Sequence, residues 1–297
     1  MATPAMTENE IDEKRVYQLL DPLYLLFDKR QIRRTRNIRL IPHEDNRRGG
    51  KYAYAEWAHV IGIFQTLLYL HLEEKWNNRI LDVGCGTGLL AIASEPYIAG
   101  AGKYVGIDVL KQDIEFCRRH YPQKHFEFIH LDKSNSAYAP MQTREPAAWP
   151  IQSGLFNMVT ALSVWTHLNE EEAFFYFREI SRVLKPGGKA IVTFFLLDAL
   201  YHQSLTNRTH EPGKFHMTFQ DSWIFDQPAY GSEMVFHPRW AKVPEQAIGV
   251  TRKGVERLVE HATMEVLEYH PGNWKEIPGL FFQDVLVFQK TNERKGT

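Results

Sequence analysis

Apolar residues along this 297-residue chain fall into two alternating spacings. Short apolar runs of strand length occur at residues 79–83, 104–107, 126–131, 155–161 and 190–197, and segments with helical spacing separate several of them. Strands that alternate with helices pair in parallel through right-handed crossovers, with helices on both faces of the sheet. The pattern therefore predicts a doubly wound, mostly parallel α/β sheet.

Further segments precede and follow this core. Helical spacing over residues 13–27 predicts an outer helix, and residues 57–68 predict an amphipathic helix just before the first strand. After the fifth strand the expected helix is delayed to residues 252–262, and two alternating segments that predict a hairpin follow it. The predicted units are an N-terminal helical extension or lid (1–75), an α/β core (76–197), a cap insertion (198–250), and a C-terminal helix with a closing hairpin (251–297).

Composition and charge narrow the setting in which the protein acts. Hydrophobic residues make up 44% of the chain, which is enough for a full core, and the formal net charge of −1 favours neither nucleic acid nor an anionic membrane. The N-terminus lacks the basic and then apolar order of an export signal, and polar residues interrupt the longest apolar stretch. With only two cysteines, a disulfide framework is not expected. We expect a cytoplasmic protein with no membrane partner.

The most informative motif is D-V-G-C-G-T-G at residues 82–88, which follows an apolar run and leads into an Ala- and Leu-rich helix. Glycines at 84, 86 and 88 let the backbone approach a bound nucleoside without side chains in the way. A dinucleotide-binding turn would need a further glycine at position 89, where this chain has Leu89. Asp108 ends the next strand 20 residues after Gly88, the place from which a carboxylate usually holds a ribose diol.

Together, the acid-x-G-x-G-x-G turn, Asp108, Asp132 after the third strand and L-K-P-G-G at residues 184–188 resemble the class I (Rossmann-like) S-adenosylmethionine-dependent methyltransferases. The resemblance covers residues 76–197 and, less specifically, 246–290. It implies a seven-stranded sheet closed by an antiparallel hairpin, and S-adenosyl-L-methionine as the cofactor.

The cofactor site is expected at the carboxyl ends of the strands. There Asp82 is predicted to bind the amino group of the methionine part, Asp108 the ribose, and Asp132 the adenine amino group. The full set of predicted cofactor contacts is Asp82, Gly84, Cys85, Gly86, Gly88, Asp108, Val109, Leu131, Asp132, Ala161 and Leu162.

The fourth and fifth strands end at the two candidate catalytic residues, His167 and Asp198. These strand ends are neighbours in the topology of the family. A neutral imidazole can accept a proton at cellular pH, so we predict His167 as the general base, oriented by Asp198. In the alternative interpretation, residues 166–172 form only a helix start, with Asn169 as its cap and acidic residues in the first turn. Asp198 could likewise only cap the turn that follows it.

Aromatic residues and histidines are dense in the cap insertion, which suggests an acceptor-binding surface, although a small cap also needs aromatic residues for its own core. Its four histidines, at 202, 210, 216 and 237, lack a metal-binding spacing, so we predict no metal site. The predicted acceptor contacts are Tyr54, Trp165, His202, Trp223, Tyr230, His237, Trp240 and Trp274.

The sequence favours a methyltransferase that acts on a hydroxyl of a small or medium polar acceptor, such as a sugar or a secondary metabolite. Two alternatives stay open: methylation of nucleic acid or protein, and a catalytically silent cofactor-binding scaffold subunit. A basic run over residues 29–39 is the only support for nucleic acid. Residues 162–165 read Leu-Ser-Val-Trp and lack the Pro-Pro-aromatic segment of enzymes that methylate nucleic-acid amino groups. No feature of the sequence sets an oligomeric state.

Overall fold

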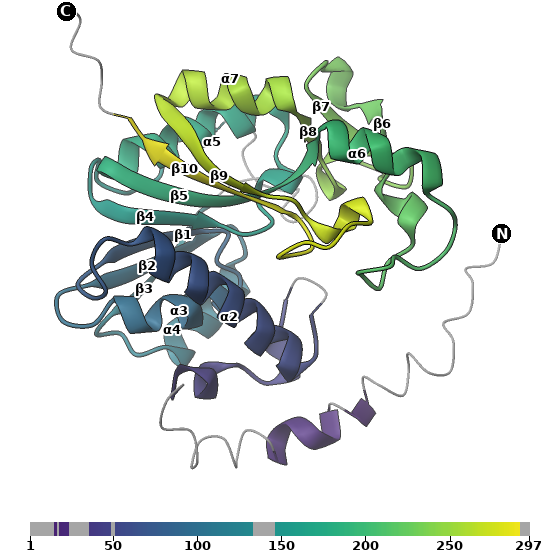
Figure 1. Cartoon of the computed structure of the whole chain (residues 1–297). Coiled ribbons are helices and arrows are strands. Elements are labelled where there is room, and N and C mark those ends of the chain that lie inside the picture. The colour runs from purple at the N-terminus through teal and green to yellow at the C-terminus, as the bar shows by residue number, and fades with distance from the viewer. Residues whose placement is uncertain (1–14, 17, 24–35, 49–50, 133–145, 292–297) are drawn as a thin grey trace, which may run out of the picture.

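A three-layer α/β/α arrangement surrounds one twisted sheet in the computed structural model, which describes residues 15–16, 18–23, 36–48, 51–132 and 146–291 (Figure 1). The strands are β1 (Arg79–Val83), β2 (Lys103–Asp108), β3 (Phe126–His130), β4 (Phe156–Ala161), β5 (Leu184–Leu197), β6 (Phe225–Pro228), β7 (Val235–Pro238), β8 (Gly249–Thr251), β9 (Met264–His270) and β10 (Asp284–Lys290). The α-helices are α2 (Tyr54–His71), α3 (Leu89–Ser94), α4 (Lys111–His120), α5 (Glu170–Val183), α6 (Ala199–Ser204) and α7 (Arg252–Ala262).

The parallel part of the sheet has the order β3-β2-β1-β4-β5, and β10 pairs antiparallel with β5 and carries β9 on its outer side. These are the seven strands that the sequence predicted, so the predicted fold class is confirmed. The central strand β1 is apolar and buried through Ile80 and Leu81 because helices cover both faces. Helices α2, α3 and α4 lie on one face, and α5 and α7 lie on the other (Figure 1).

Strand β5 is the branch point of the sheet. Its middle pairs with β10 through residues 189–194, and its last three residues, 195–197, pair in parallel with β8. The predicted turn at 184–188 is a bulge within β5, because the pairing with β4 jumps from Leu184 to Lys189. Gly187 in this bulge has a φ of +71°, which glycine adopts without strain.

The cap extends the sheet, because β8, β7 and β6 continue it beyond the end of β5. These three short strands are additional to the predicted seven. A separate apolar cluster around Phe195, Phe225 and Trp274 joins the cap to the core. The cap is thereby held directly over the carboxyl end of β5.

The N-terminal extension packs across the same end of the sheet. Residues 18–23 are helical, and Asp21 forms a buried ion pair with Arg47 at 2.6 Å. Most of the basic run, including Lys29, Arg30 and Arg33, lies outside the described residues. Across the described segments, none of the helices combines the length and the apolar character needed to cross a membrane.

Candidate functional site

Backbone hydrogen bonds connect the glycine turn after β1 to the end of β2. The amides of Gly84 and Cys85 both donate to the carbonyl oxygen of Ile107 at the end of β2, at 2.8 and 3.1 Å. Gly84, Gly86 and Gly88 have φ values of +67°, +49° and +91°, so all three glycines occupy the left-handed region that side chains disfavour. A Cβ on Gly84 would lie 2.5 Å from Cγ2 of Val164. The backbone conformation of the turn and the lack of space beside Gly84 therefore both require glycine.

Asp108 lies beside this turn at the end of β2. Its carboxylate accepts hydrogen bonds from the amides of Gly86 at 2.7 Å and Leu110 at 2.8 Å. Burial raises the pKa of Asp108, and these two amide donors oppose the rise. The two bonds fix the carboxylate at the wall of the central cavity, where the ribose was expected.

The carboxylate of Asp82, predicted to bind the amino group of the methionine part, is surrounded by side chains of the neighbouring strands. Its carboxylate is buried and accepts hydrogen bonds from Tyr104 Oη at 2.5 Å and Thr160 Oγ1 at 2.9 Å. Burial raises the pKa of Asp82 to about 7, against the effect of these two donors. In the structure this side chain ties β1 to β2 and β4 beneath the turn, and it is not among the described residues that line the cavity. Sequence alone could not reveal its partners, because they lie on neighbouring strands.

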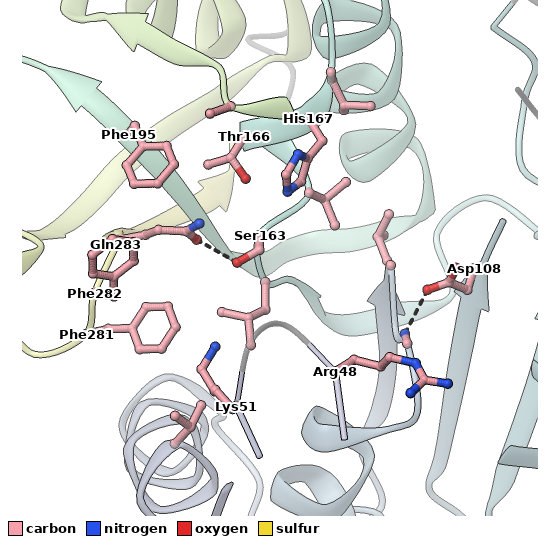
Figure 2. A pocket seen from close by; sticks show the side chains of 18 of the residues that line it. Arg48, Lys51, Asp108, Ser163, Thr166, His167, Phe195, Phe281, Phe282 and Gln283 are labelled. Carbon is pink, nitrogen blue, oxygen red and sulfur yellow. Dashed lines mark hydrogen bonds between the residues drawn. The ribbon is translucent and has the colours of Figure 1, made fainter. Parts of the chain in front are cut away.

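A cavity of about 1030 Å³ opens at the carboxyl ends of the strands (Figure 2). Ligand pockets commonly have volumes of about 300–1,000 Å³, so this cavity lies at the upper end of that range. We call the part of the cavity near Asp108 the donor side, because the methyl donor is expected there. Six of the predicted cofactor contacts line it: Gly84, Gly86, Asp108, Val109, Leu131 and Leu162. Of the other predicted cofactor contacts, Cys85 and Ala161 are buried in the core, Gly88 caps α3, and Asp132 is exposed.

His167 also lines this cavity, and it lies in the short 3-10 helix Trp165–His167 between β4 and α5. Its Nδ1 lies 2.7 Å from the carbonyl oxygen of Glu245, and a carbonyl can only accept, so Nδ1 carries the proton and Nε2 has the lone pair. Burial lowers the pKa of His167 below 6.5, although this hydrogen bond opposes the change. The imidazole is therefore neutral near pH 7. Asn169 also caps α5, because its side chain accepts a hydrogen bond from Glu172 N. The segment is therefore a helix start, as the alternative interpretation had it, and His167 nevertheless lines the cavity.

The expected pairing of Asp198 with His167 needs correction. One carboxylate oxygen of Asp198 accepts from Tyr201 N at 2.9 Å and contacts Lys275 Nζ at 3.0 Å, and the other accepts from Tyr269 Oη at 2.6 Å. The Lys275 ammonium and its second partner Asp284 are fully buried, at 2.8 Å from each other. Asp198 belongs to this ion-pair cluster and to the N-terminus of α6, and a backbone carbonyl takes the orienting position beside His167.

Among the predicted acceptor residues, the structure places Trp223 on the cavity wall. Trp165 and Trp274 are buried in the core, where their Nε1 atoms donate to Ala173 O and Asp284. The remaining predicted residues are also not among the described residues that line the cavity: Tyr54, His202, Tyr230, His237 and Trp240. Trp165 and Trp274 therefore serve to pack the core, as the alternative interpretation of the sequence allowed, whereas the rings of Tyr230 and Trp240 are exposed.

Ser163 and Gln283 form a part of the wall that sequence reasoning missed. Ser163 has a φ of +58°, an uncommon conformation for a residue other than glycine, and its amide donates to Thr193 Oγ1 at 2.8 Å. Its Oγ donates to Gln283 Oε1 at 2.9 Å (Figure 2). The only sequence signal was the position of Ser163 directly after a strand, because Gln283 is 120 residues away.

The N-terminal extension supplies Arg48 and Lys51 to the cavity wall (Figure 2). The Arg48 guanidinium contacts the buried Asp113 carboxylate of α4 at 2.9 Å. Lys51 lies with Nζ 5.6 Å from the centre of the Phe281 ring, and burial lowers its pKa while Glu56 raises it. The two residues flank the glycine pair at positions 49–50 of the sequence.

The donor side fits a nucleoside cofactor on its own geometry. A Cβ on Gly86 would meet no atom within 4 Å, so a side chain there would project into the cavity. The Asp108 carboxylate keeps acceptor capacity beyond its two amide donors, which suits a ribose diol. In the described part of the chain, no group of three or more His, Cys, Asp or Glu residues is arranged to hold a metal ion.

Comparison with known proteins agrees with this geometry. Residues 80–188 match the family model described as a methyltransferase domain. The chain is 28% identical over 119 residues to a ubiquinone biosynthesis O-methyltransferase of Idiomarina loihiensis, a match covering 40% of this chain and 43% of that protein. It is 31% identical over 129 residues to an O-methyltransferase of Pyrenophora dematioidea, covering 43% of each chain. These matches span less than half the length of either relative.

A solved structure of a SAM-dependent methyltransferase from Methanosarcina mazei has the same fold, with a TM-score of 0.50, 21% identity, and coverage of 76% of this chain and 98% of that one. The matched domain contains the glycine turn, Asp108 and the bulge at 184–188. Residues 80–188 of this chain therefore form a methyltransferase domain with the fold of the S-adenosylmethionine-dependent methyltransferases, whose cofactor is S-adenosyl-L-methionine.

Proposed function

We propose that this protein transfers a methyl group from S-adenosylmethionine to a hydroxyl oxygen of a small-molecule acceptor. The observation that carries this proposal is that one cavity is lined both by the glycine turn with Asp108 and by His167, whose Nδ1 is held by the carbonyl oxygen of Glu245. Such an arrangement provides a place for a donor and a proton acceptor facing a second ligand. The matched relatives named as O-methyltransferases support the choice of oxygen.

The bound cofactor supplies an electrophilic methyl group on a sulfonium sulfur. The turn at Gly84 and Gly86 would let it approach the backbone, and Asp108 would accept hydrogen bonds from its ribose hydroxyls. His167 would act as the base that takes the proton of the acceptor hydroxyl, whose oxygen would receive the methyl group. Glu245 keeps the proton on Nδ1 through its carbonyl oxygen and stabilises the imidazolium that results.

Residues of both the cap and the N-terminal extension line this site. Phe195, Trp223 and Phe282 on one side and Lys51 on the other narrow the cavity around the acceptor position. Placement of the oxygen in line with the methyl carbon is then the main catalytic contribution of the protein.

The test is methyl transfer by the purified protein. With S-adenosylmethionine and a set of hydroxylated small molecules, we expect a mass increase of one methyl group on an acceptor oxygen and stoichiometric release of S-adenosylhomocysteine. No saturable binding of S-adenosylmethionine or S-adenosylhomocysteine in calorimetry would contradict the proposal. Cofactor binding with methylation confined to nucleic acid or protein would replace the acceptor class.

A further inference from the structure

The acceptor side of the cavity, which we define by Phe195, Trp223 and Phe282, has an aromatic wall. The rings of Phe195 and Trp223 stack with their centres 4.9 Å apart, and Phe282 packs edge-on against both, at 5.9 and 5.2 Å. All three residues line the cavity. They provide an apolar surface, and polar side chains of the same part of the lining decide what else a ligand needs.

Gln283 follows this wall in the chain, and two hydroxyl groups fix the orientation of its amide. Its Oε1 accepts a hydrogen bond from Ser163 Oγ at 2.9 Å (Figure 2) and another from Thr193 Oγ1 at 2.6 Å. Thr193 Oγ1 itself accepts from the Ser163 amide, so its own hydrogen is left to donate to Gln283. The side chain is only 6% exposed and lines the cavity. Its Nε2 is thus a fixed donor for which the described residues offer no acceptor.

Thr166 and Asn273 carry two further unpaired polar groups of this lining. Thr166 lies three residues after Ser163, in the 3-10 helix before α5, and is fully buried. Asn273 lies beside Phe281, because its backbone amide donates to the Phe281 carbonyl oxygen at 3.0 Å. Thr166 Oγ1 and Asn273 Oδ1 are buried atoms, and in the segments that the structure describes neither has a hydrogen-bond partner. Both residues line the cavity.

The chemistry of these three groups restricts the ligand that can pair with them. Leaving a buried polar group unpaired costs free energy, so a bound ligand should supply partners. Gln283 Nε2 can only donate, Asn273 Oδ1 can only accept, and the Thr166 hydroxyl can do either. A carboxylate would pair with Gln283 but be opposed by Asn273 Oδ1, and an ammonium group would do the reverse. A neutral hydroxyl both donates and accepts, so hydroxyl groups fit all three positions.

The polar groups and the aromatic wall together suit a saturated ring. Ligand pockets are lined mainly by apolar and aromatic side chains, with a few polar groups that fix the orientation of the ligand. The carbon atoms of a saturated ring can pack on the faces of Phe195, Trp223 and Phe282. Hydroxyl groups around the same ring can then reach the polar groups of the lining.

We infer that the acceptor is a saturated ring compound with several hydroxyl groups, which pair with Gln283 Nε2, Thr166 Oγ1 and Asn273 Oδ1. This inference rests on the proposed function and narrows its acceptor class. Ser163 and Thr193 are positioning residues, because they act on the acceptor only through the Gln283 amide.

The test uses three probes that share one six-membered carbon ring and differ in their hydroxyl groups: myo-inositol, trans-cyclohexane-1,2-diol and cyclohexanol. Each is titrated calorimetrically into the full chain saturated with S-adenosylhomocysteine. Affinity should rise with the number of hydroxyl groups, and myo-inositol should bind at least about tenfold more tightly than cyclohexanol. The reason is that each paired hydroxyl satisfies a buried group that is otherwise unpaired.

Two variants remove single polar groups at nearly constant volume. Gln283→Leu and Thr166→Val should each weaken myo-inositol binding about tenfold. Cyclohexanol has one hydroxyl, which can pair with a remaining group, so its affinity should change less than about twofold. Gln227→Leu is the matched control, because Gln227 lies in β6 of the cap, outside the described cavity lining. This variant should bind all three probes like the wild type.

The inference is overturned if myo-inositol does not bind to the S-adenosylhomocysteine complex, or if cyclohexanol binds as tightly. Equal losses of both probes in the variants, or unchanged binding of myo-inositol, would also contradict it. If Gln283→Leu does not fold, the isosteric Thr166→Val decides the question alone. Failure of S-adenosylhomocysteine itself to bind to the wild type would contradict the proposed function instead, so the two failures are distinguishable.

Discussion

The donor side and the acceptor side of the cavity are constructed in different ways. Gly84, Gly86 and Asp108 lie within 25 residues of each other, on adjacent strand ends, and backbone hydrogen bonds hold them. The acceptor side gathers His167, Trp223 and Phe282 from segments far apart in the chain. A backbone-held site tolerates little change at its glycines, whereas a wall of packed side chains can change its ligand through single substitutions. We therefore expect the fold to determine which methyl donor binds, and the side chains particular to this chain to determine which acceptor binds.

The largest expected effect is at His167. His167→Ala should lower kcat about 10²- to 10⁴-fold while the affinity for S-adenosylhomocysteine stays unchanged, because the base acts only on the acceptor. Steady-state rates and calorimetry measure the two quantities. His202→Ala is the control, since His202 is exposed and outside the described cavity lining. Full turnover in His167→Ala would remove this residue from the mechanism.

The pH profile sharpens the same point. Burial lowers the pKa of His167, and the base that we propose is the neutral form of this residue. The acidic limb of kcat against pH should therefore have its midpoint below 6.5, with activity lost as pH falls through that value. A midpoint above 7 would indicate that another group controls the rate.

Gly84→Ala tests the donor side. A Cβ at this φ of +67° costs about 1–2 kcal/mol and would also collide with Val164, so S-adenosylhomocysteine affinity should fall at least about tenfold. Gly62→Ala is the matched control: it lies in α2, and a Cβ there meets no atom within 4 Å. That change should stabilise the helix slightly and leave binding unaltered. Equal affinities of the two variants would show that the turn does not contact the cofactor.

Asp198→Asn distinguishes stability from catalysis. The substitution keeps a helix cap but leaves buried Lys275 with only Asp284 as a charged partner, so we expect a loss of about 2 kcal/mol in unfolding free energy. Denaturant melts measure this loss, and kcat should change less than twofold. Asp226→Asn, at the exposed pair with Arg239, should cost under about 1 kcal/mol. A large fall in kcat for Asp198→Asn at unchanged stability would restore the catalytic role predicted from the sequence.

The smallest effect concerns Asp82. Its pKa of about 7 in the folded protein exceeds its ordinary value of 3.8, so the folded state retains this proton to higher pH and the stability contribution falls between pH 4 and 7. Asp82→Asn should flatten this dependence and raise the unfolding free energy at pH 8 relative to the wild type. Unfolding at pH 5 and 8 measures it. An unchanged slope would place the charge of Asp82 in contact with solvent or ligand.

The same contrast explains what could be predicted from sequence. The strands, the closing hairpin and the glycine turn could be predicted from local sequence. Apolar residues repeat with the period of each element, and the positions of the turn with a positive φ are occupied by glycine. The hydrogen bonds of Asp82 to Tyr104 and Thr160 could not be predicted, because these residues become its neighbours only when the strands pair. Ser163 and Gln283 went unnoticed for the same reason.

Asp198 shows a second limit of sequence reasoning. Position at the end of a strand suggested contact with His167, but the buried ammonium of Lys275 attracts this carboxylate, and Lys275 lies 77 positions later in the chain. Among the tryptophans, those at 165 and 274 are core residues and only Trp223 of the predicted acceptor set lines the cavity. Residue type alone could not separate packing from binding in an aromatic-rich cap.

The central claim is that the glycine turn and Asp108 bind the cofactor of the family, and calorimetric titration of S-adenosylhomocysteine into the full chain tests it most directly. The account predicts saturable binding with one site per chain, weakened at least about tenfold in Gly84→Ala and unchanged in Gly62→Ala. Absence of saturable binding to the folded wild-type protein would contradict the account.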